Sequence, residues 1–125
     1  MILADTSIWV DHFRLGDERL RGQLLRGEVI THPWVIGELA LGGLSPDSEA
    51  GRLVAELPRA AVATHSEVMH AITSRSLARR GIGFVDAHLI VAVLLTTGAQ
   101  LSTRDARLAA VADDLGVGVR SPPLR

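Results

Sequence analysis

The stretch Met1-Ile-Leu-Ala-Asp-Thr-Ser-Ile-Trp-Val10 decides how the rest of the chain can fold. Its apolar run, Ile2–Ala4, ends in Asp5-Thr6-Ser7 before apolar residues resume. Such a run predicts a strand buried on both faces, as in a parallel sheet. Thr6 or Ser7 can cap a helix that starts there. Asp5 would then stand at the carboxyl end of a central strand, where open α/β sheets bind their ligands. On this stretch alone, a turn or helix cap is the simpler interpretation of Asp5.

Length and composition predict one domain over residues 1–125 with a largely aliphatic core. The chain is 47% hydrophobic but only 3% aromatic, and it has no cysteine. The lack of cysteine excludes a disulfide framework and thiolate metal sites. The longest apolar run, residues 89–95, is too short to span a bilayer, and the amino terminus does not resemble a signal peptide. We therefore expect a soluble cytoplasmic protein without a membrane partner.

The charged residues exclude several reaction classes. All 13 basic residues are arginine, so no lysine is available for a P-loop or a Schiff base. The net charge of −1 is low for a sequence-blind nucleic-acid binder, which is normally basic.

Short apolar runs alternate with helical patterns along the whole chain. Further strands are expected at residues 29–31, 61–63, 98–102 and 117–119, and helices are expected to be opened by Asp17, His32-Pro33, Ser45-Pro46, Ser66 and Asp86, with a last one carrying Leu108 to Leu115. This alternation predicts an α/β fold, a three-layer α/β/α sandwich with a central parallel sheet.

Four acids occupy comparable places in this pattern. Asp5 and Asp105 follow expected strands, and Glu38 is the only acid in an otherwise apolar helix. Asp86 starts a helix that is apolar all round, which is typical of a buried helix. Each acid also has a structural interpretation, as a solvated residue or a helix cap. If the sheet order reverses between the first and fourth strands, however, a cleft forms there and the four acids could border it.

Four carboxylates around one cleft repel one another unless a cation is present. Hard oxygen ligands without a His or Cys pattern suit Mg²⁺ or Mn²⁺. Such ions lower the pKa of a bound water and stabilise charge during displacement at phosphorus. The sequence therefore predicts metal-dependent phosphodiester hydrolysis.

The acidic motifs, in this order, resemble those of the PIN-domain ribonucleases. The matching residues are Asp5-Thr6-Ser7, Glu38, Phe84-Val85-Asp86-Ala87 and Leu101-Ser102-Thr103-Arg104-Asp105. The small chain also resembles the VapC toxins of bacterial type II toxin–antitoxin pairs. The resemblance implies an RNA-cleaving toxin in which Asp5, Glu38, Asp86 and Asp105 bind Mg²⁺ and act in catalysis. Thr6, Ser7 or Thr103 would supply a hydroxyl. It further implies a homodimer and an antitoxin that places a basic side chain near the acids.

Two other functions were weighed against this one. A phosphoaspartyl phosphatase needs a second acid two residues after Asp5, where Ser7 stands, and a lysine. A non-enzymatic binding module, whose acidic cleft holds a partner's arginine, is the stronger alternative, and metal-dependent RNA cleavage would discriminate against it. Arginines 75, 79, 80, 104 and 107 could line a phosphate track, although exposed arginines are usually just solvated. A lone histidine such as His88 is usually a packed or surface residue.

Overall fold

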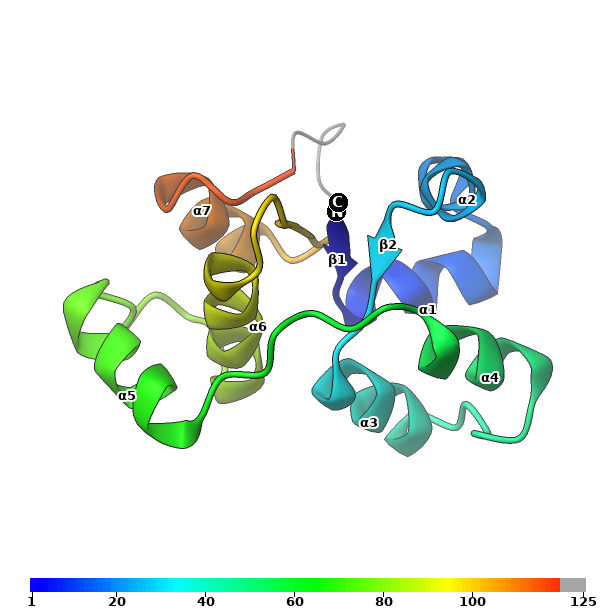
Figure 1. Cartoon of the computed structure of the whole chain (residues 1–125), viewed down its shortest axis with the longest axis horizontal. Coiled ribbons are helices and arrows are strands. Elements are labelled where there is room, and N and C mark those ends of the chain that lie inside the picture. The colour runs from blue at the N-terminus through cyan, green and yellow to red at the C-terminus, as the bar shows by residue number, and fades with distance from the viewer. Residues whose placement is uncertain (120–125) are drawn as a thin grey trace.

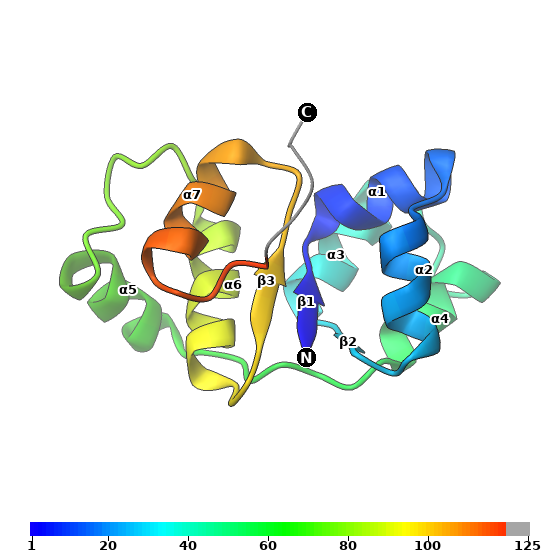
Figure 2. The same ribbon diagram turned by 90° about the horizontal axis from the view of Figure 1, so that it is seen from above.

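The computed structural model describes residues 1–119, and at its centre lies a three-stranded parallel sheet in the order β2-β1-β3 (Figure 2). The central strand β1 (Ile2–Ala4) pairs with β2 (Val29–Ile30) on one side and with β3 (Gln100–Ser102) on the other. All three residues of β1 are buried. The expectation that the first strand is central and adjoins the strand preceding Asp105 is confirmed, so the sheet order reverses at β1.

Within the described residues, seven helices surround this sheet. They are α1 (Thr6–Leu15), α2 (Glu18–Leu25), α3 (Pro33–Leu41), α4 (Glu49–Glu56), α5 (His65–Ser74), α6 (Phe84–Leu95) and α7 (Ala106–Asp114). The chain moves across the sheet in one direction from β1 to β2, and in the opposite direction from β2 to β3. Connections between parallel strands are right-handed, so the helices of these two connections must cover opposite faces of the sheet. In Figure 1, α3 to α6 lie in the lower half of the molecule and α2 and α7 in the upper half. The predicted α/β class is confirmed.

The core is aliphatic, as the composition predicts. Fully buried aliphatic side chains come from every layer, among them Leu3, Leu20, Val35, Ile90, Leu101 and Val111. Helix α6 is buried without interruption from Ala87 to Val93, which confirms the prediction from its apolar sequence. Even so, no helix within residues 1–119 is long and apolar enough to cross a membrane.

Four predicted helix starts are displaced by one to three residues. The observed caps are Asp5 for α1, Ser48 for α4, Thr64 for α5 and Gly83 for α6, in place of Thr6 or Ser7, Ser45-Pro46, Ser66 and Asp86. In the first three, the side-chain oxygen accepts the backbone N–H three residues further on, from Ile8, Gly51 and Glu67 respectively. Several capping residues stand close together in these stretches, and only the folded backbone selects one of them.

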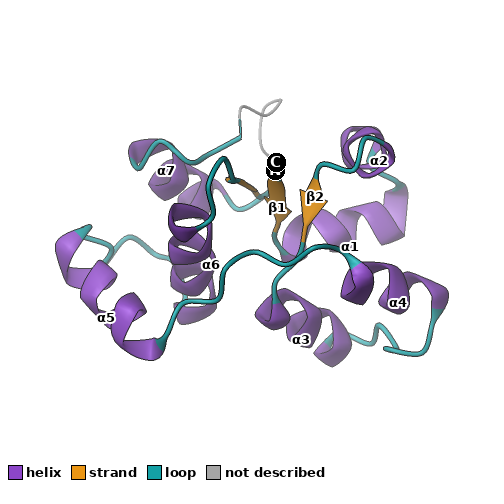
Figure 3. Ribbon diagram, in the orientation of Figure 1, coloured by secondary structure: helices purple, strands orange, loops and turns teal. Residues whose placement is uncertain are grey.

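Two predicted strands do not form. Residues 61–63 belong to the loop between α4 and α5 (Figure 3), where only Arg59 makes a single bridge to Thr31. Residues 117–119 contribute one bridge, between Gly118 and Leu101. In the first of these segments, Thr96 Oγ1 accepts the Ala61 N–H at 2.9 Å, so a side chain takes a bond that a strand neighbour would make. The sheet therefore has three strands within residues 1–119, where the sequence pattern predicted five.

Candidate catalytic and metal site

Asp5 lies at the carboxyl end of the central strand, as predicted, and it also caps α1. Its Oδ1 accepts the Ile8 N–H at 3.3 Å, and the residue is only 6% exposed. The two interpretations of Asp5 are therefore compatible, because the helix cap holds the carboxylate at the switch point of the sheet.

Three hydroxyls bind the predicted acids directly. Ser7 Oγ donates to Asp5 Oδ1, and Thr103 Oγ1 donates to Asp5 Oδ2. Each of these two hydroxyls also accepts a backbone N–H, from Arg104 at 2.8 Å and from Asp105 at 3.0 Å. Because a hydroxyl that accepts from the backbone has its proton free to donate, the loop after β3 orients both oxygens of Asp5. Thr6 Oγ1 donates to Glu38 Oε1 at 2.7 Å and links α1 to α3 in the same way.

Asp86 and Asp105 each occupy the start of a helix. Asp86 lies in the first turn of α6 and accepts the Gly83 N–H at 3.0 Å. Asp105 caps α7 and accepts the N–H groups of Arg107 and Leu108 at 2.9 and 3.1 Å. A helix N-terminus favours negative charge, so both positions help to hold carboxylates that would otherwise repel their neighbours.

The charge of Asp86 interacts with the charges of the other three acids. Burial raises the pKa of Asp5, and the charge of Asp86 raises it further against the hydrogen bonds from Ser7 and Thr103. Burial also raises the pKa of Asp86, and the charges of Asp105 and Glu38 add to that effect. Asp86 is therefore the carboxylate that interacts with all three others.

The donor set suits a hard divalent cation, although it does not form a closed cage. Among residues 1–119, no three His, Cys, Asp or Glu side chains converge closely enough to enclose a metal by themselves. Mg²⁺ does not need such a cage, because it keeps several waters and is commonly held by one or two carboxylates. Carboxylates whose pKa values are raised by burial and mutual repulsion are the kind that a cation stabilises.

Comparison with known proteins decides the family. The PIN-domain family model matches residues 2–114. The chain belongs to the PIN-domain family. It is also similar to proteins named Ribonuclease VapC32 from two strains of Mycobacterium tuberculosis, CDC 1551 / Oshkosh and ATCC 25618 / H37Rv. Each is 44% identical over 119 residues, which cover 95% of this chain and 96% of the relative. Within the PIN-domain family, the chain therefore groups with the VapC ribonucleases.

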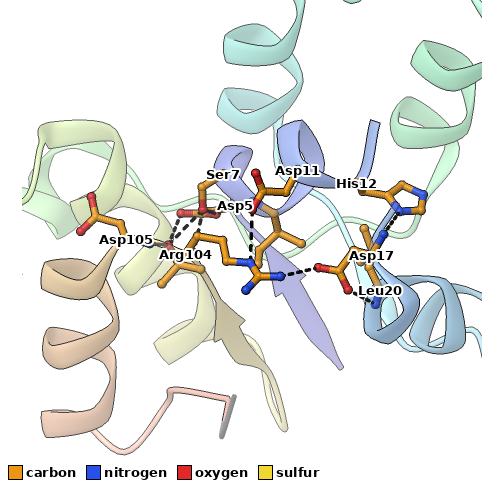
Figure 4. Close-up of polar contacts among 10 residues, drawn as sticks. Asp5, Ser7, Asp11, His12, Asp17, Leu20, Arg104 and Asp105 are labelled. Carbon is orange, nitrogen blue, oxygen red and sulfur yellow. Dashed lines mark hydrogen bonds and ion pairs between the residues drawn. The ribbon is translucent and has the colours of Figure 1, made fainter. Parts of the chain in front are cut away.

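An arginine network beside the four acids is not apparent from the sequence. Arg104 lies between Thr103 and Asp105, and its side chain extends away from Asp5 to Asp11 and Asp17 (Figure 4). The ion-pair distances are 3.4 Å to Asp11 and 3.2 Å to Asp17. Burial alone would raise the pKa of Asp17, but the Leu20 N–H and Arg104 outweigh it and lower that pKa. No spacing in the sequence signals this contact, because its partners are 87 or more positions apart.

We expect Arg104→Met to lower the free energy of unfolding by about 2 kcal/mol, because it leaves Asp17, whose side chain is 9% exposed, without its cation. Urea denaturation measures this change. Arg21→Met is the matched control, because Arg21 pairs with Glu18 at 3.6 Å with both side chains mostly exposed. Arg21→Met should lower the free energy of unfolding by less than about 0.5 kcal/mol. Equal losses for the two variants would mean that the Arg104 network contributes no more than a surface pair.

Two of the five arginines that could line a phosphate track form ion pairs within the chain. Arg104 is bound to Asp11 and Asp17, and Arg80 pairs with Asp114 at 2.6 Å. These two guanidinium groups are engaged with carboxylates of the same chain. Helix α5 ends at Ser74, so Arg75 and Arg79 do not share a helical face, and Arg79 adopts a positive φ of 63°.

Proposed function

We propose that this chain is a Mg²⁺-dependent endoribonuclease toxin, with Mn²⁺ able to substitute. One feature supports the proposal above all others. Asp86 interacts electrostatically with Asp5, Glu38 and Asp105 at the carboxyl end of the central strand. The similarity to proteins named as ribonucleases over nearly the whole chain supports RNA as the substrate. We further propose that residues 1–125 act as one domain.

In this proposal the four acids are both metal ligands and catalytic residues. A bound cation would supply an activated water and neutralise charge on the scissile phosphate. Asp5, Glu38, Asp86 and Asp105 would hold the ion, directly or through its bound waters. Ser7 and Thr103 hold both oxygens of Asp5, and Thr6 holds Oε1 of Glu38.

The chemistry predicts the ends of the RNA products. We expect a 5′-phosphate and a 3′-hydroxyl, because a water attacks phosphorus and the ribose 2′-hydroxyl takes no part as nucleophile. Incubation of RNA with the purified protein in Mg²⁺, followed by ligation-based analysis of the new ends, tests this directly, and EDTA should stop the reaction. Products with 2′,3′-cyclic phosphates would instead indicate attack by the 2′-hydroxyl and would contradict the mechanism.

We also propose a cytoplasmic homodimer controlled by an antitoxin. Among residues 1–119, twelve large hydrophobic side chains are exposed on the single chain, including Leu25 at 82% and Leu41 at 91%. Apolar surface of this kind is often covered by a partner. The antitoxin would bring a basic side chain to the acids and order on binding. Light scattering of the purified chain should give the mass of a dimer, and a monomer at high concentration would contradict this part of the proposal.

The alternative is a binding module whose carboxylates hold a partner's arginine and cut nothing. It differs from the enzyme in one measurable respect, because it needs no divalent metal. A purified chain that binds neither Mg²⁺ nor Mn²⁺ and leaves RNA intact would favour the module.

A further inference from the structure

Half of the chain's few aromatic side chains gather at one place on the surface. The chain has two tryptophans, two phenylalanines and no tyrosine. Trp9 is fully buried, and Phe13 stacks on it. Trp34 and Phe84 lie elsewhere on the surface and are 39% and 40% exposed.

Trp34, Phe84 and His88 form what we call the aromatic cluster. The Trp34 indole stacks on the His88 ring, with centroids 4.3 Å apart and an interplanar angle of 20°. Phe84 meets both rings edge-on, at 6.4 Å from Trp34 and 5.0 Å from His88. The His88 side chain is buried, so its ring supports the Trp34 indole from one side and leaves the other side as a flat surface.

The aromatic cluster lies beside the carboxylates. Trp34 precedes Glu38 by four residues on α3, so the two side chains share one face of that helix. Phe84 opens α6 and precedes Asp86 by two residues in the same turn. The ring contacts bring the first turns of these two helices together, as the lower half of Figure 1 illustrates. An RNA strand with a phosphate at the acids would carry its neighbouring bases across this surface.

We propose that Trp34 and Phe84 form a subsite on which an unpaired base of the RNA stacks beside the phosphodiester bond to be cut. This inference rests on the proposed ribonuclease function and adds two residues that position the substrate. Aromatic side chains bind single-stranded RNA by stacking, and they tolerate any base because every base has a π-face. A base inside a duplex is covered on both faces by its neighbours. The aromatic cluster therefore selects single-stranded RNA at the cleavage site.

Binding without cleavage tests the subsite. The probe is a twelve-nucleotide oligo(A), added to the full chain in EDTA at low salt so that the strand is not cut. The fluorescence of Trp34 should be quenched by this single strand, and much less by the same oligo(A) in a duplex with oligo(U). Trp9 adds a fluorescence background that the RNA does not quench by contact, because this side chain is fully buried. Equal quenching by the single strand and the duplex would overturn the proposal.

Variants then separate stacking from folding. Trp34→Leu and Phe84→Leu should each weaken oligo(A) binding, measured by anisotropy of a labelled strand, by about 5- to 150-fold. Trp34→Phe keeps an aromatic ring and should bind within about threefold of the wild type. Phe13→Leu is the matched control, because Phe13 is also 39% exposed but lies on α1 against Trp9, and it should bind as the wild type does. Circular dichroism checks that each variant is folded. If Trp34→Leu fails to fold, Phe84→Leu and Trp34→Phe still decide the question.

The outcomes distinguish this inference from the proposed function. Trp34-dependent binding of single strands without any metal-dependent cutting would leave the subsite standing and remove the enzyme. Metal-dependent cutting with an unchanged affinity and KM in both leucine variants would keep the enzyme and remove the subsite. If Trp34→Leu turned a dimer into a monomer and bound RNA normally, the aromatic cluster would be an interface between copies of the chain.

Discussion

Replacing Asp86 with asparagine is expected to lower RNA cleavage in Mg²⁺ at least about 100-fold while leaving the protein folded. Asp86 is the acid whose charge interacts with the three others, so its removal weakens the hold on a cation more than any other single change. Loss of metal-assisted charge stabilisation is worth several kcal/mol, and each 1.36 kcal/mol corresponds to about tenfold in rate. Cleavage of a labelled RNA by purified protein measures the loss.

Asp86 is also a cleaner site to mutate than Asp5. The asparagine oxygen can still accept the Gly83 N–H that Asp86 accepts now. In Asp5→Asn, by contrast, one of the two hydroxyls that donate to the buried carboxylate would face an amide donor, and the fold would suffer as well. Glu56→Gln, which removes an exposed acid from α4, controls for net charge and should cut normally. An Asp86→Asn enzyme as fast as the wild type would show that the four acids are not the catalytic centre.

Saturating Mn²⁺ is expected to raise the melting temperature by roughly 10 °C. A ligand that binds only the folded state adds RT ln(1 + [L]/Kd), about 2.7 kcal/mol at a hundred times Kd, and for a domain of this size each kcal/mol corresponds to several degrees. Thermal denaturation with and without Mn²⁺ measures the shift. Potassium chloride at the same ionic strength should give a smaller shift, because screening does not replace coordination. Identical melting curves in Mn²⁺ and in matched salt would remove the metal from the proposal.

The direction of the pKa shifts predicts how the stability of the metal-free protein depends on pH. Asp5 and Asp86 have pKa values above the ordinary aspartate value of 3.8, so the folded state binds their protons more tightly than the unfolded state does. Their carboxylates therefore begin to destabilise the fold as pH rises above 3.8, and the penalty is complete above the raised pKa values. At neutral pH, Asp86→Asn removes part of this penalty.

The Asp86→Asn variant thus has two expected signatures in melting experiments. Without metal it should melt no lower than the wild type, because a repelled carboxylate has become neutral. With Mn²⁺ it should lose most of the stabilisation, whereas Glu56→Gln should keep it. A full Mn²⁺ shift in Asp86→Asn would place the bound ion elsewhere on the molecule.

Features that depend on short-range pattern could be predicted from the sequence. The apolar run Ile2–Ala4 predicted the central strand, and the unbroken apolar segment after Asp86 predicted the buried helix α6. Asp5, Asp86 and Asp105 stand next to such runs and Glu38 is the sole acid of an apolar helix, and the resemblance to the PIN-domain motifs joined the four into one predicted site. Local pattern was insufficient for the helix caps, where neighbouring serines, threonines and aspartates all qualify. It also overpredicted strands, because residues 61–63 and 117–119 lack enough partners to pair along their length.

Only the tertiary structure decided how these residues meet. Thr103 reaches Asp5 across 98 positions of sequence, and Thr6 reaches Glu38 across 32. The role of Asp86 at the centre of the acids depends on α6 and α7 starting beside the end of β1. The pairing of Arg104 with Asp11 and Asp17, and the stacking of Trp34 on His88, likewise join segments that no periodicity connects. The physical reason is the same in each case. A side chain's charge and hydrogen-bonding capacity are local properties, whereas its partner is chosen by the order of the strands and the packing of the helices between them.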